Sequence, residues 1–104
     1  MINIRQTEQF SGWLHRLKDR RARARILVRI DRFRHGNPGD VKSVGAGVFE
    51  MRIPEGKGYR VYYAQHGESI ILLLCGGDKS SQSADIAMAK RLNAQVEQDN
   101  GKDQ

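Results

Sequence analysis

The sequence has 104 residues, which is enough for one domain with a modest core but not for two. Its 18 Lys and Arg outnumber its 12 Asp and Glu, and the formal net charge of +6 favours a polyanionic partner such as nucleic acid or an acidic protein. No apolar run approaches the ~20 residues of a membrane-spanning helix, and the opening "MINIRQTEQF" lacks the features of a signal peptide, so we expect a cytoplasmic protein with no membrane partner.

Two helices are predicted near the N-terminus, after a short first strand at residues 2–5. Thr7 is a helix cap, and the apolar residues after it recur at i, i+3, i+4 and i+7, so the first helix should run over residues 8–19. The second helix should run over residues 20–34 and end at the loop "HGNPGD". The apolar residues on one side of this second helix are Ala22, Ile26, Ile30 and Phe33.

The second helix lies in the most basic part of the chain. Nine of the 18 cations lie between positions 16 and 34, with only Asp19 and Asp31 as local acids. Arg21, Arg25 and Arg32 line up away from the apolar side, either as a surface that contacts phosphates or a partner, or as a solvated face of a good helix former. No aromatic residues alternate with these arginines, so base stacking is not indicated there.

Three strands follow, joined by short turns. Apolar and polar residues alternate in "VGAGVFEMRI", so Glu50 and Arg52 should share a face, and in "YRVYYAQ" the same holds for Arg60 and Tyr62. The segment "SIILLLC" is apolar on both faces, as expected of a central strand that is covered on each side. These strands should form an antiparallel meander.

A last helix is predicted over "SADIAMAKRLNAQVEQ", with Ile86, Ala89 and either Leu92 or Val96 facing inward. Residues 1–97 then make one domain, and residues 98–104 a polar, disordered tail. The order β-α-α-β-β-β-α predicts an α+β domain, in which two N-terminal helices pack on an antiparallel sheet and a helix closes the chain.

The cysteine and histidine residues do not predict a redox or metal centre. Cys75 is the only cysteine and lies in an apolar strand, which favours core packing over a nucleophilic role. His15, His35 and His66 are far apart in the sequence, without cysteines at ligand spacing. We therefore expect no metal and no cofactor.

Charged and aromatic residues of two strands are expected to converge on one surface. Pairing of residues 48–53 with 59–65 would bring four of them together: Glu50, Arg52, Arg60 and Tyr62. Lys79, at the end of the next strand, could approach the same surface if Gly76 and Gly77 let the backbone turn sharply.

Such a cluster has the parts that metal-independent RNA cleavage requires. A base takes the proton of a ribose 2′-hydroxyl, cations hold the phosphate, and an acid protonates the departing 5′-oxygen. Arginine binds two phosphate oxygens with its planar fork, and lysine can accept or donate a proton. Each residue also has a structural alternative: Glu50 and Arg52 as a solvated pair, Arg60 as a turn anchor, Tyr62 as packing and Lys79 as a solvated strand end.

Two segments resemble a known family, the RelE/ParE toxin superfamily, and most closely its addiction-module killer branch, also described as HigB-like. The segments are "GAGVFEMRIPEGKGYRVYY" and "LLLCGGDKSSQSADIAMAKRL". The resemblance extends from "FSGWLHRLKD" through the last helix, and the combination of "GYRVYY" with "GGDKSSQ" is fairly specific. It implies a RelE-like fold and a toxin of a type II toxin–antitoxin pair, whose partner is a cognate antitoxin. Ribosome-dependent members of the superfamily cut messenger RNA in the decoding site with basic and aromatic residues and no metal.

The resemblance also assigns site residues. The arginine of the family's G-Y-R motif is Arg60, a basic position on the preceding strand is Arg52, and the basic residue after the final strand is Lys79. Glu50 stands where RelE itself has a lysine, so it would serve as the base or orient Arg52. The aromatic acid near the C-terminus of RelE has no match, because no tyrosine follows Tyr63.

Further residues are expected to bind RNA. Lys57, in the turn between the two strands, and Tyr62 would contact the substrate, and the second helix would contact ribosomal RNA through Arg21, Arg25 and Arg32. Two alternatives to an mRNA endonuclease remain open, because one fold can carry several functions. One is a ParE-like poison of DNA gyrase, and the other is a non-catalytic module that binds nucleic acid or the antitoxin.

Overall fold

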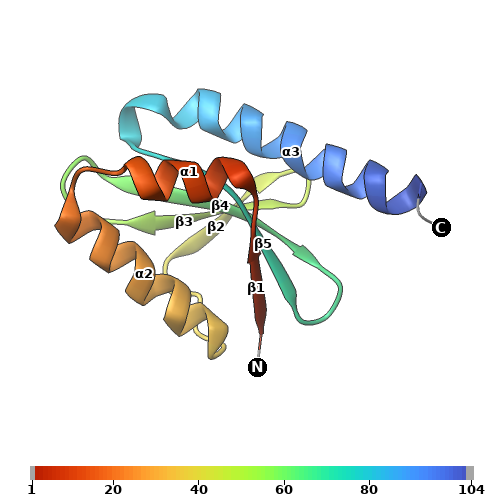
Figure 1. The fold of residues 1–104 in the computed structure, drawn as a ribbon, viewed down its shortest axis with the longest axis horizontal. Coiled ribbons are helices and arrows are strands. Elements are labelled where there is room, and N and C mark those ends of the chain that lie inside the picture. The colour runs from red at the N-terminus through yellow and green to blue at the C-terminus, as the bar shows by residue number, and fades with distance from the viewer. Residues whose placement is uncertain (1, 103–104) are drawn as a thin grey trace.

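In the computed structural model, which describes residues 2–102, a five-stranded sheet lies between two N-terminal helices and a C-terminal helix (Figure 1). The elements in chain order are β1 (Asn3–Gln6), α1 (Glu8–Arg16), α2 (Arg20–Arg34), β2 (Val41–Gly45), β3 (Val48–Ile53), β4 (Tyr59–His66), β5 (Ile70–Gly77), the 3₁₀ helix η1 (Lys79–Ser81) and α3 (Gln82–Lys102). The predicted α+β, RelE-like class is confirmed, with β2 and η1 as additions. The helix α3 continues to Lys102, into the segment predicted as a polar tail, and residues 103 and 104 lie outside the described residues.

Side-chain caps fix where α1 and α2 begin. The Thr7 hydroxyl oxygen accepts a hydrogen bond from the Phe10 N–H at 3.0 Å, as predicted, and Asp19 accepts one from the Ala22 N–H at 3.0 Å. The first helix ends at Arg16, earlier than predicted, because Asp19 takes an extended backbone to cap α2.

The order of strands in the sheet is β1-β5-β4-β3-β2. Each neighbouring pair from β2 to β5 is antiparallel, as the meander predicts, whereas β1 lies parallel to β5. The strand β5 therefore lies inside the sheet, and its apolar side chains are covered on both faces, which confirms the interpretation of "SIILLLC". The edges of the sheet are β1 and β2.

Two apolar clusters hold the helices to opposite faces of the sheet. The cluster under α1 and α2 includes Phe10, Ile26, Phe33, Met51, Val61, Tyr63 and Leu73. The cluster under α3 includes Val48, Tyr62, Ala64, Leu74, Cys75 and Ala89, with Ile86 and Leu92 packed against it. Alternate residues of β4 belong to different clusters, as the period of a strand requires.

A bulge in β5 changes the direction of its last side chains. Tyr62 of β4 lies opposite Cys75, but its neighbour Tyr63 lies opposite Leu73, so Leu74 is the extra residue of the bulge. Leu74 and Cys75 therefore both face α3.

The glycines at 76 and 77 allow two helices to approach the sheet from opposite sides. A Cβ atom at Gly76 would collide with the Trp13 ring of α1, and one at Gly77 would collide with the Asp85 carboxylate of α3. Neither glycine has a positive φ, and both belong to β5. The prediction that they turn the chain sharply to aim Lys79 is therefore wrong, because their role is close packing.

Candidate functional site

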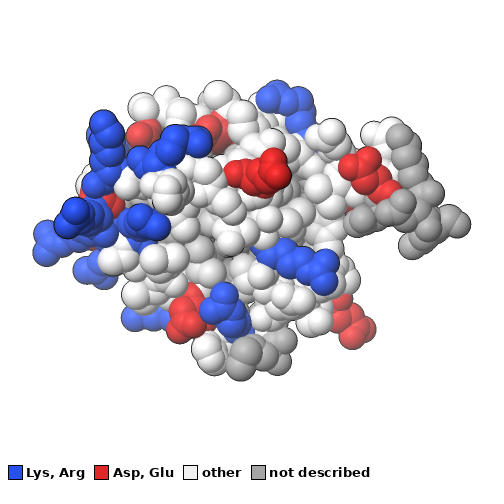
Figure 2. All heavy atoms as spheres, in the orientation of Figure 1, with Lys and Arg blue, Asp and Glu red and all other residues white. Residues whose placement is uncertain are grey.

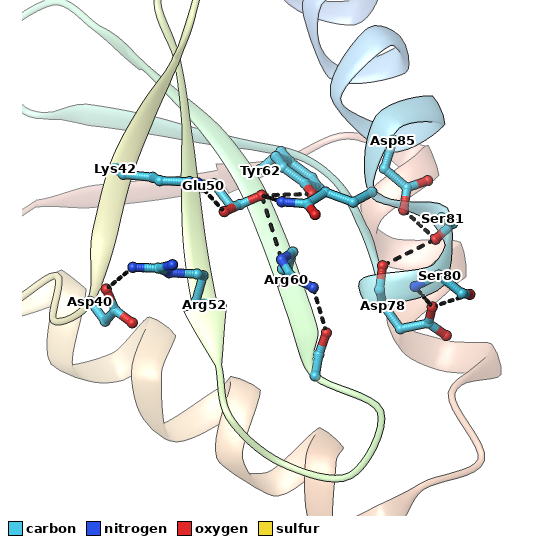
Figure 3. Close-up of polar contacts among 12 residues, drawn as sticks. Asp40, Lys42, Glu50, Arg52, Arg60, Tyr62, Asp78, Ser80, Ser81 and Asp85 are labelled. Carbon is cyan, nitrogen blue, oxygen red and sulfur yellow. Dashed lines mark hydrogen bonds and ion pairs between the residues drawn. The ribbon is translucent and has the colours of Figure 1, made fainter.

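Glu50 of β3 lies at the centre of a polar network on the α3 side of the sheet (Figure 3). Its side chain is 0% exposed, and its Oε2 accepts hydrogen bonds from the Tyr62 hydroxyl at 3.0 Å and from Gln82 Nε2 at 2.9 Å. A carboxylate is buried only with such donors, because an unpaired buried charge costs several kcal/mol. The alternative of a solvated surface charge at Glu50 is therefore wrong.

Two cations flank this carboxylate. Lys42 Nζ lies 3.8 Å from Glu50 Oε1, and Arg60 Nε lies 3.6 Å from Glu50 Oε2. The register of the sheet explains the arrangement, because Lys42, Glu50 and Tyr62 are successive partners across β2, β3 and β4. One buried negative charge thus lies between two positive charges from neighbouring strands.

Arg52 and Arg60 are also register partners, as the sequence predicts for the paired strands. Arg60 is largely buried, with 13% of its side chain exposed, and its Nη1 donates to the Gly58 carbonyl at 3.1 Å. Arg52 Nη2 instead pairs with Asp40 Oδ1 at 3.0 Å. Glu50 therefore contacts Arg60 and not Arg52, which corrects the expectation that it orients Arg52.

Arg29 of α2 supports this region from the helix side. Its guanidinium donates to the carbonyls of Arg52, Pro38 and Asp40, which ties the segment before β2 to the end of β3. Burial lowers the pKa of Arg29. The position of the Asp40 carboxylate beside Arg52 is thus fixed by the backbone that Arg29 holds.

Lys79 borders the arginine pair. A surface hollow of about 380 Å³ is lined by Arg52, Arg60 and Lys79, together with Asp40, Pro54, Gly58 and Tyr59 among others. Lys57 and Lys79 line the neighbouring hollow, with Asp78 and Ser80. The structure therefore brings three predicted cations to one hollow and places Lys57 next to it.

Hydrogen bonds hold the turn that carries Lys79. Asp78 accepts from the Ser80 N–H at 2.8 Å and from the Ser80 hydroxyl at 2.5 Å, and these bonds lower the pKa of Asp78. The Ser81 hydroxyl donates to Asp85 at 2.6 Å, while burial raises the pKa of Asp85. The start of η1 is thus fixed by its own polar side chains (Figure 3).

Burial keeps two further groups of this face protonated. It raises the pKa of Tyr62, and the hydrogen bond to Glu50 raises it further, so the hydroxyl remains a donor. Burial also raises the pKa of Cys75 to about 12. Cys75 packs in the apolar cluster under α3, which confirms the prediction of core packing.

Comparison with known proteins places this arrangement in a family. Residues 12–94 match the family described as "Phage derived protein Gp49-like (DUF891)". The chain belongs to the Gp49-like family. Members of this family are in general RelE- or HigB-like, and the topology described above is RelE-like, so the match supports the resemblance at the level of the superfamily.

A relative of this Gp49-like chain occurs in Haemophilus influenzae (strain ATCC 51907 / DSM 11121 / KW20 / Rd). It is described as "Uncharacterized protein" and is 53% identical over 91 residues, which cover 88% of this chain and 92% of the relative. No solved structure matches the chain. These comparisons establish the family and leave the activity to be inferred from the site.

The predicted arginines of α2 lie apart from the hollow of the arginine pair. Arg21 Nε and Arg25 Nε lie 3.8 and 3.5 Å from the Glu55 carboxylate, in the turn between β3 and β4. Arg32 is exposed and lies roughly 16 Å further along the helix axis than Arg21. The three arginines are thus a separate surface of the Gp49-like domain, and their predicted contact with RNA remains a prediction.

Three residues of the site were not found from the sequence: Asp40, Lys42 and Gln82. Lys42 was missed with its strand, because a register shift between Ser43 and Gly45 breaks the alternation of β2. Gln82 contacts Glu50 only because α3 crosses the sheet at that point. The one available signal was the acid-base pair in "DVK", directly before a region of apolar and polar alternation.

Two further features are absent from the part of the chain that the structure describes. Within residues 2–102, no three His, Cys, Asp or Glu side chains come together as they would to hold a metal ion. Over the same residues, no helix combines the length and the apolar character needed to cross a membrane.

Proposed function

We propose that this Gp49-like protein is the toxin of a type II toxin–antitoxin pair, and that it inhibits translation by cutting messenger RNA on the ribosome without a metal ion. The observation that carries the proposal is the placement of Arg52, Arg60 and Lys79 around one hollow. Two arginines at directly opposite strand positions repel each other, so a phosphate between them would be strongly favoured.

The arginines would hold the scissile phosphate and stabilise the charge that builds up on it. Glu50 has no exposed surface, so we assign it a positioning role: its negative charge attracts the Arg60 guanidinium, whose Nε lies 3.6 Å away without a hydrogen bond, while Gly58 accepts a hydrogen bond from Nη1. Within residues 2–102, the hydrogen bond of the Arg60 guanidinium is that of Nη1 to Gly58, so Nη2 is left to bind a phosphate oxygen.

Proton transfer then falls to exposed groups of the hollow. Asp40 is the carboxylate that lines it, with 55% of its side chain exposed, and would accept the proton of the 2′-hydroxyl. Lys79 is exposed and would protonate the departing 5′-oxygen. The sequence leaves the base open between Glu50 and Lys79. We assign it to Asp40 instead, because the buried Glu50 does not reach the substrate and Lys79 is assigned as the acid.

A second candidate function is a non-catalytic module that binds nucleic acid or the antitoxin. The observation that favours it is the internal pairing of the cluster, since Arg52 pairs with Asp40 and Arg60 with Glu50. Internal pairing weakens the attraction of each arginine for a phosphate. The two candidates differ in whether the RNA is cut, so cleavage is the property to measure.

The test is induced expression followed by primer extension on a translated message and on an untranslated copy, with EDTA added to reactions of the purified protein. The proposal expects cuts in the translated message alone, unaffected by EDTA. Arg60→Ala should abolish them, and Asp40→Asn should reduce them by about 100-fold or more, the usual range for a general base. Arg91→Ala, a change of an exposed cation on α3, is the matched control and should cut at the wild-type rate.

Two other outcomes would contradict the proposal. Intact message with halted growth would contradict the nuclease proposal and direct the next assay to DNA supercoiling by gyrase. A folded Arg60→Ala variant that still cuts normally would remove the assigned site. Circular dichroism and the melting temperature of each variant show whether it is folded.

The proposed partners follow from the same charges. We expect an acidic antitoxin that covers part of the basic surface, and a ribosomal RNA contact through the arginines of α2. The RNA contact should weaken steeply with salt, because each bound phosphate releases counterions. An affinity for ribosomes that does not change between low and high salt would contradict this contact.

A further inference from the structure

A second hollow, on the α1 side of the sheet end, has features that the proposed cleavage site does not use. It has a volume of about 510 Å³ and is formed by α1, the segment between α1 and α2, the turn between β3 and β4, and Asp78. Its lining includes two aromatic residues, Trp13 and Tyr59, and three cations, Arg16, Lys18 and Lys57.

The Trp13 ring is fixed in place. It lies on the backbone of β5 because Gly76 has no side chain, and its centroid lies 5.9 Å from the ring of Phe10 and 6.4 Å from the ring of Tyr59. Trp13 is only partly buried and lines the hollow. A rigid, partly exposed ring is a good stacking surface, because little conformational entropy is lost when a planar group binds to it.

The cations of this hollow are available to a ligand. The two carboxylates of the lining are engaged within the protein: Asp19 caps α2, and Asp78 accepts two hydrogen bonds from Ser80. In the described part of the chain, none of the three cations forms an ion pair with a carboxylate. The hollow therefore combines an apolar floor with three cations and two carboxylates, which leaves a net positive charge of one.

The hollow also leads to the proposed cleavage site. Lys57 and Asp78 line both this hollow and a neighbouring hollow, to which Lys79 also contributes. Lys79 in turn lines the hollow of Arg52 and Arg60. Figure 2 shows that Lys and Arg side chains gather at this end of the molecule, on the left of the view, where α2 begins. Shared lining residues thus connect the hollow of Trp13 with the hollow of Arg60.

We propose that this hollow binds one unpaired base of a single-stranded RNA, stacked on Trp13, while Arg16, Lys18 and Lys57 bind the phosphates that lead towards Arg60. Aromatic stacking beside a cationic groove is the usual way in which single strands are bound without a base-pairing code. The proposal rests on the proposed function for its substrate class, but it can be tested without cleavage.

Trp13 provides the readout because it is the only tryptophan of the chain. The purified protein would be titrated with an eight-nucleotide RNA in which every 2′-hydroxyl is methylated, so that it cannot be cut. We expect saturable quenching of Trp13 fluorescence. A sugar-phosphate strand of the same length without bases should compete for the cations but leave the fluorescence unchanged.

Two variants separate this hollow from general electrostatics. Lys57→Ala should weaken binding severalfold and reduce the slope of log K against log salt concentration by about 0.7, the value for one phosphate contact of a single strand. Arg91→Ala, an exposed cation on α3, should change neither quantity beyond the small effect of net charge.

The result that would overturn the proposal is a lack of quenching at millimolar RNA, or quenching that Lys57→Ala and Arg91→Ala reduce equally. Quenching by the strand without bases would also overturn it, because stacking would then not be the cause. Failure of the base site is distinguishable from failure of the proposed function. If the protein cuts translated message but RNA does not quench Trp13 fluorescence, the nuclease role stands and the base site does not. If RNA quenches Trp13 fluorescence as expected but no message is cut, the base site stands and the nuclease role does not.

Discussion

On the face of the sheet under α1 and α2, aliphatic and aromatic side chains form the larger apolar cluster, whereas the face under α3 has a buried carboxylate beside a smaller cluster. Both buried polar side chains of the described residues, Glu50 and Asn93, lie on the α3 side. An apolar core stabilises a small domain far more than a buried ion pair does. The comparison indicates that one face mainly stabilises the fold and the other mainly positions charges.

Removing an aromatic side chain from the first face should have the largest effect on stability. Phe10 is 0% exposed and packs among α1, α2 and the sheet, so Phe10→Ala should lower the free energy of unfolding by about 4 kcal/mol. Urea unfolding followed by circular dichroism measures the change. Leu27→Ala, at a residue that is 48% exposed on α2, is the control and should change stability little. Equal losses in the two variants would remove the contrast between core and surface on this face.

On the face under α3, stability should depend on the charge of a buried side chain rather than on its volume. Glu50→Ala removes the acceptor of Tyr62 and Gln82 and leaves Arg60 without a counter-charge, so a loss of about 3 kcal/mol is expected. Glu50→Gln keeps the shape and one acceptor oxygen, so it should lose less stability while still weakening the position of Arg60. If Glu50→Ala unfolds at the wild-type urea concentration, the network does not stabilise this face.

A methyl group added at Gly76 should lower the stability of the face under α1 and α2, because Gly76 lies directly against Trp13 of α1. Gly76→Ala would push against the Trp13 ring, which cannot move easily, and overpacking of this kind costs about 2 kcal/mol. Gly12→Ala is a matched control within α1, because its Cβ would meet only the flexible end of Arg16 and alanine favours helix. The control should be neutral or stabilising. A stabilised Gly76→Ala variant would show that α1 is not in close contact with β5.

Alkaline pH should lower the free energy of unfolding by acting on the face under α3. This is the smallest of the four effects on stability. The pKa of Cys75 is raised from an ordinary value of 9.0 to about 12, so the folded state binds the proton more tightly than the unfolded state. Stability is then fully present below pH 9 and falls as the pH rises towards 12, with a loss of about 1 kcal/mol at pH 10. Tyr62 adds to the loss because its pKa is raised as well.

Urea unfolding at pH 8 and pH 10 measures this dependence. Cys75→Ala should show a smaller loss between the two pH values than the wild type, whatever its stability at pH 8. An unchanged pH dependence in the variant would mean that the thiol ionises as easily in the folded protein as in the unfolded chain.

Most helices and strands were predictable because their signals are local. Thr7 and the apolar residues of α2 specify their elements within a few neighbours in the sequence, and alternation specifies β3 and β4. The missed strand β2 has a bulge at Ser43 and Gly45 that hides its alternation. The parallel pairing of β1 with β5 joins distant parts of the chain, and no local pattern reports it.

The candidate site was likewise predictable only where local sequence patterns determine it. Alternation and one hairpin were sufficient to pair Arg52 with Arg60 and Glu50 with Tyr62. The burial of Glu50 was not predictable, because it depends on α3 bringing Gln82 over the strand. The choice of Arg60 rather than Arg52 as its partner depends likewise on Asp40, which Arg29 positions from α2.

The buried thiol of Cys75 also makes this protein convenient for spectroscopy. With 3% of its surface exposed and a pKa of about 12, Cys75 should react very slowly with maleimide dyes at neutral pH. A cysteine introduced at position 68, in the exposed turn between β4 and β5, would then take up the dye selectively without removal of the native thiol. With Trp13 as the donor and that dye as the acceptor, energy transfer would report in real time whether the turn moves when RNA or an antitoxin binds.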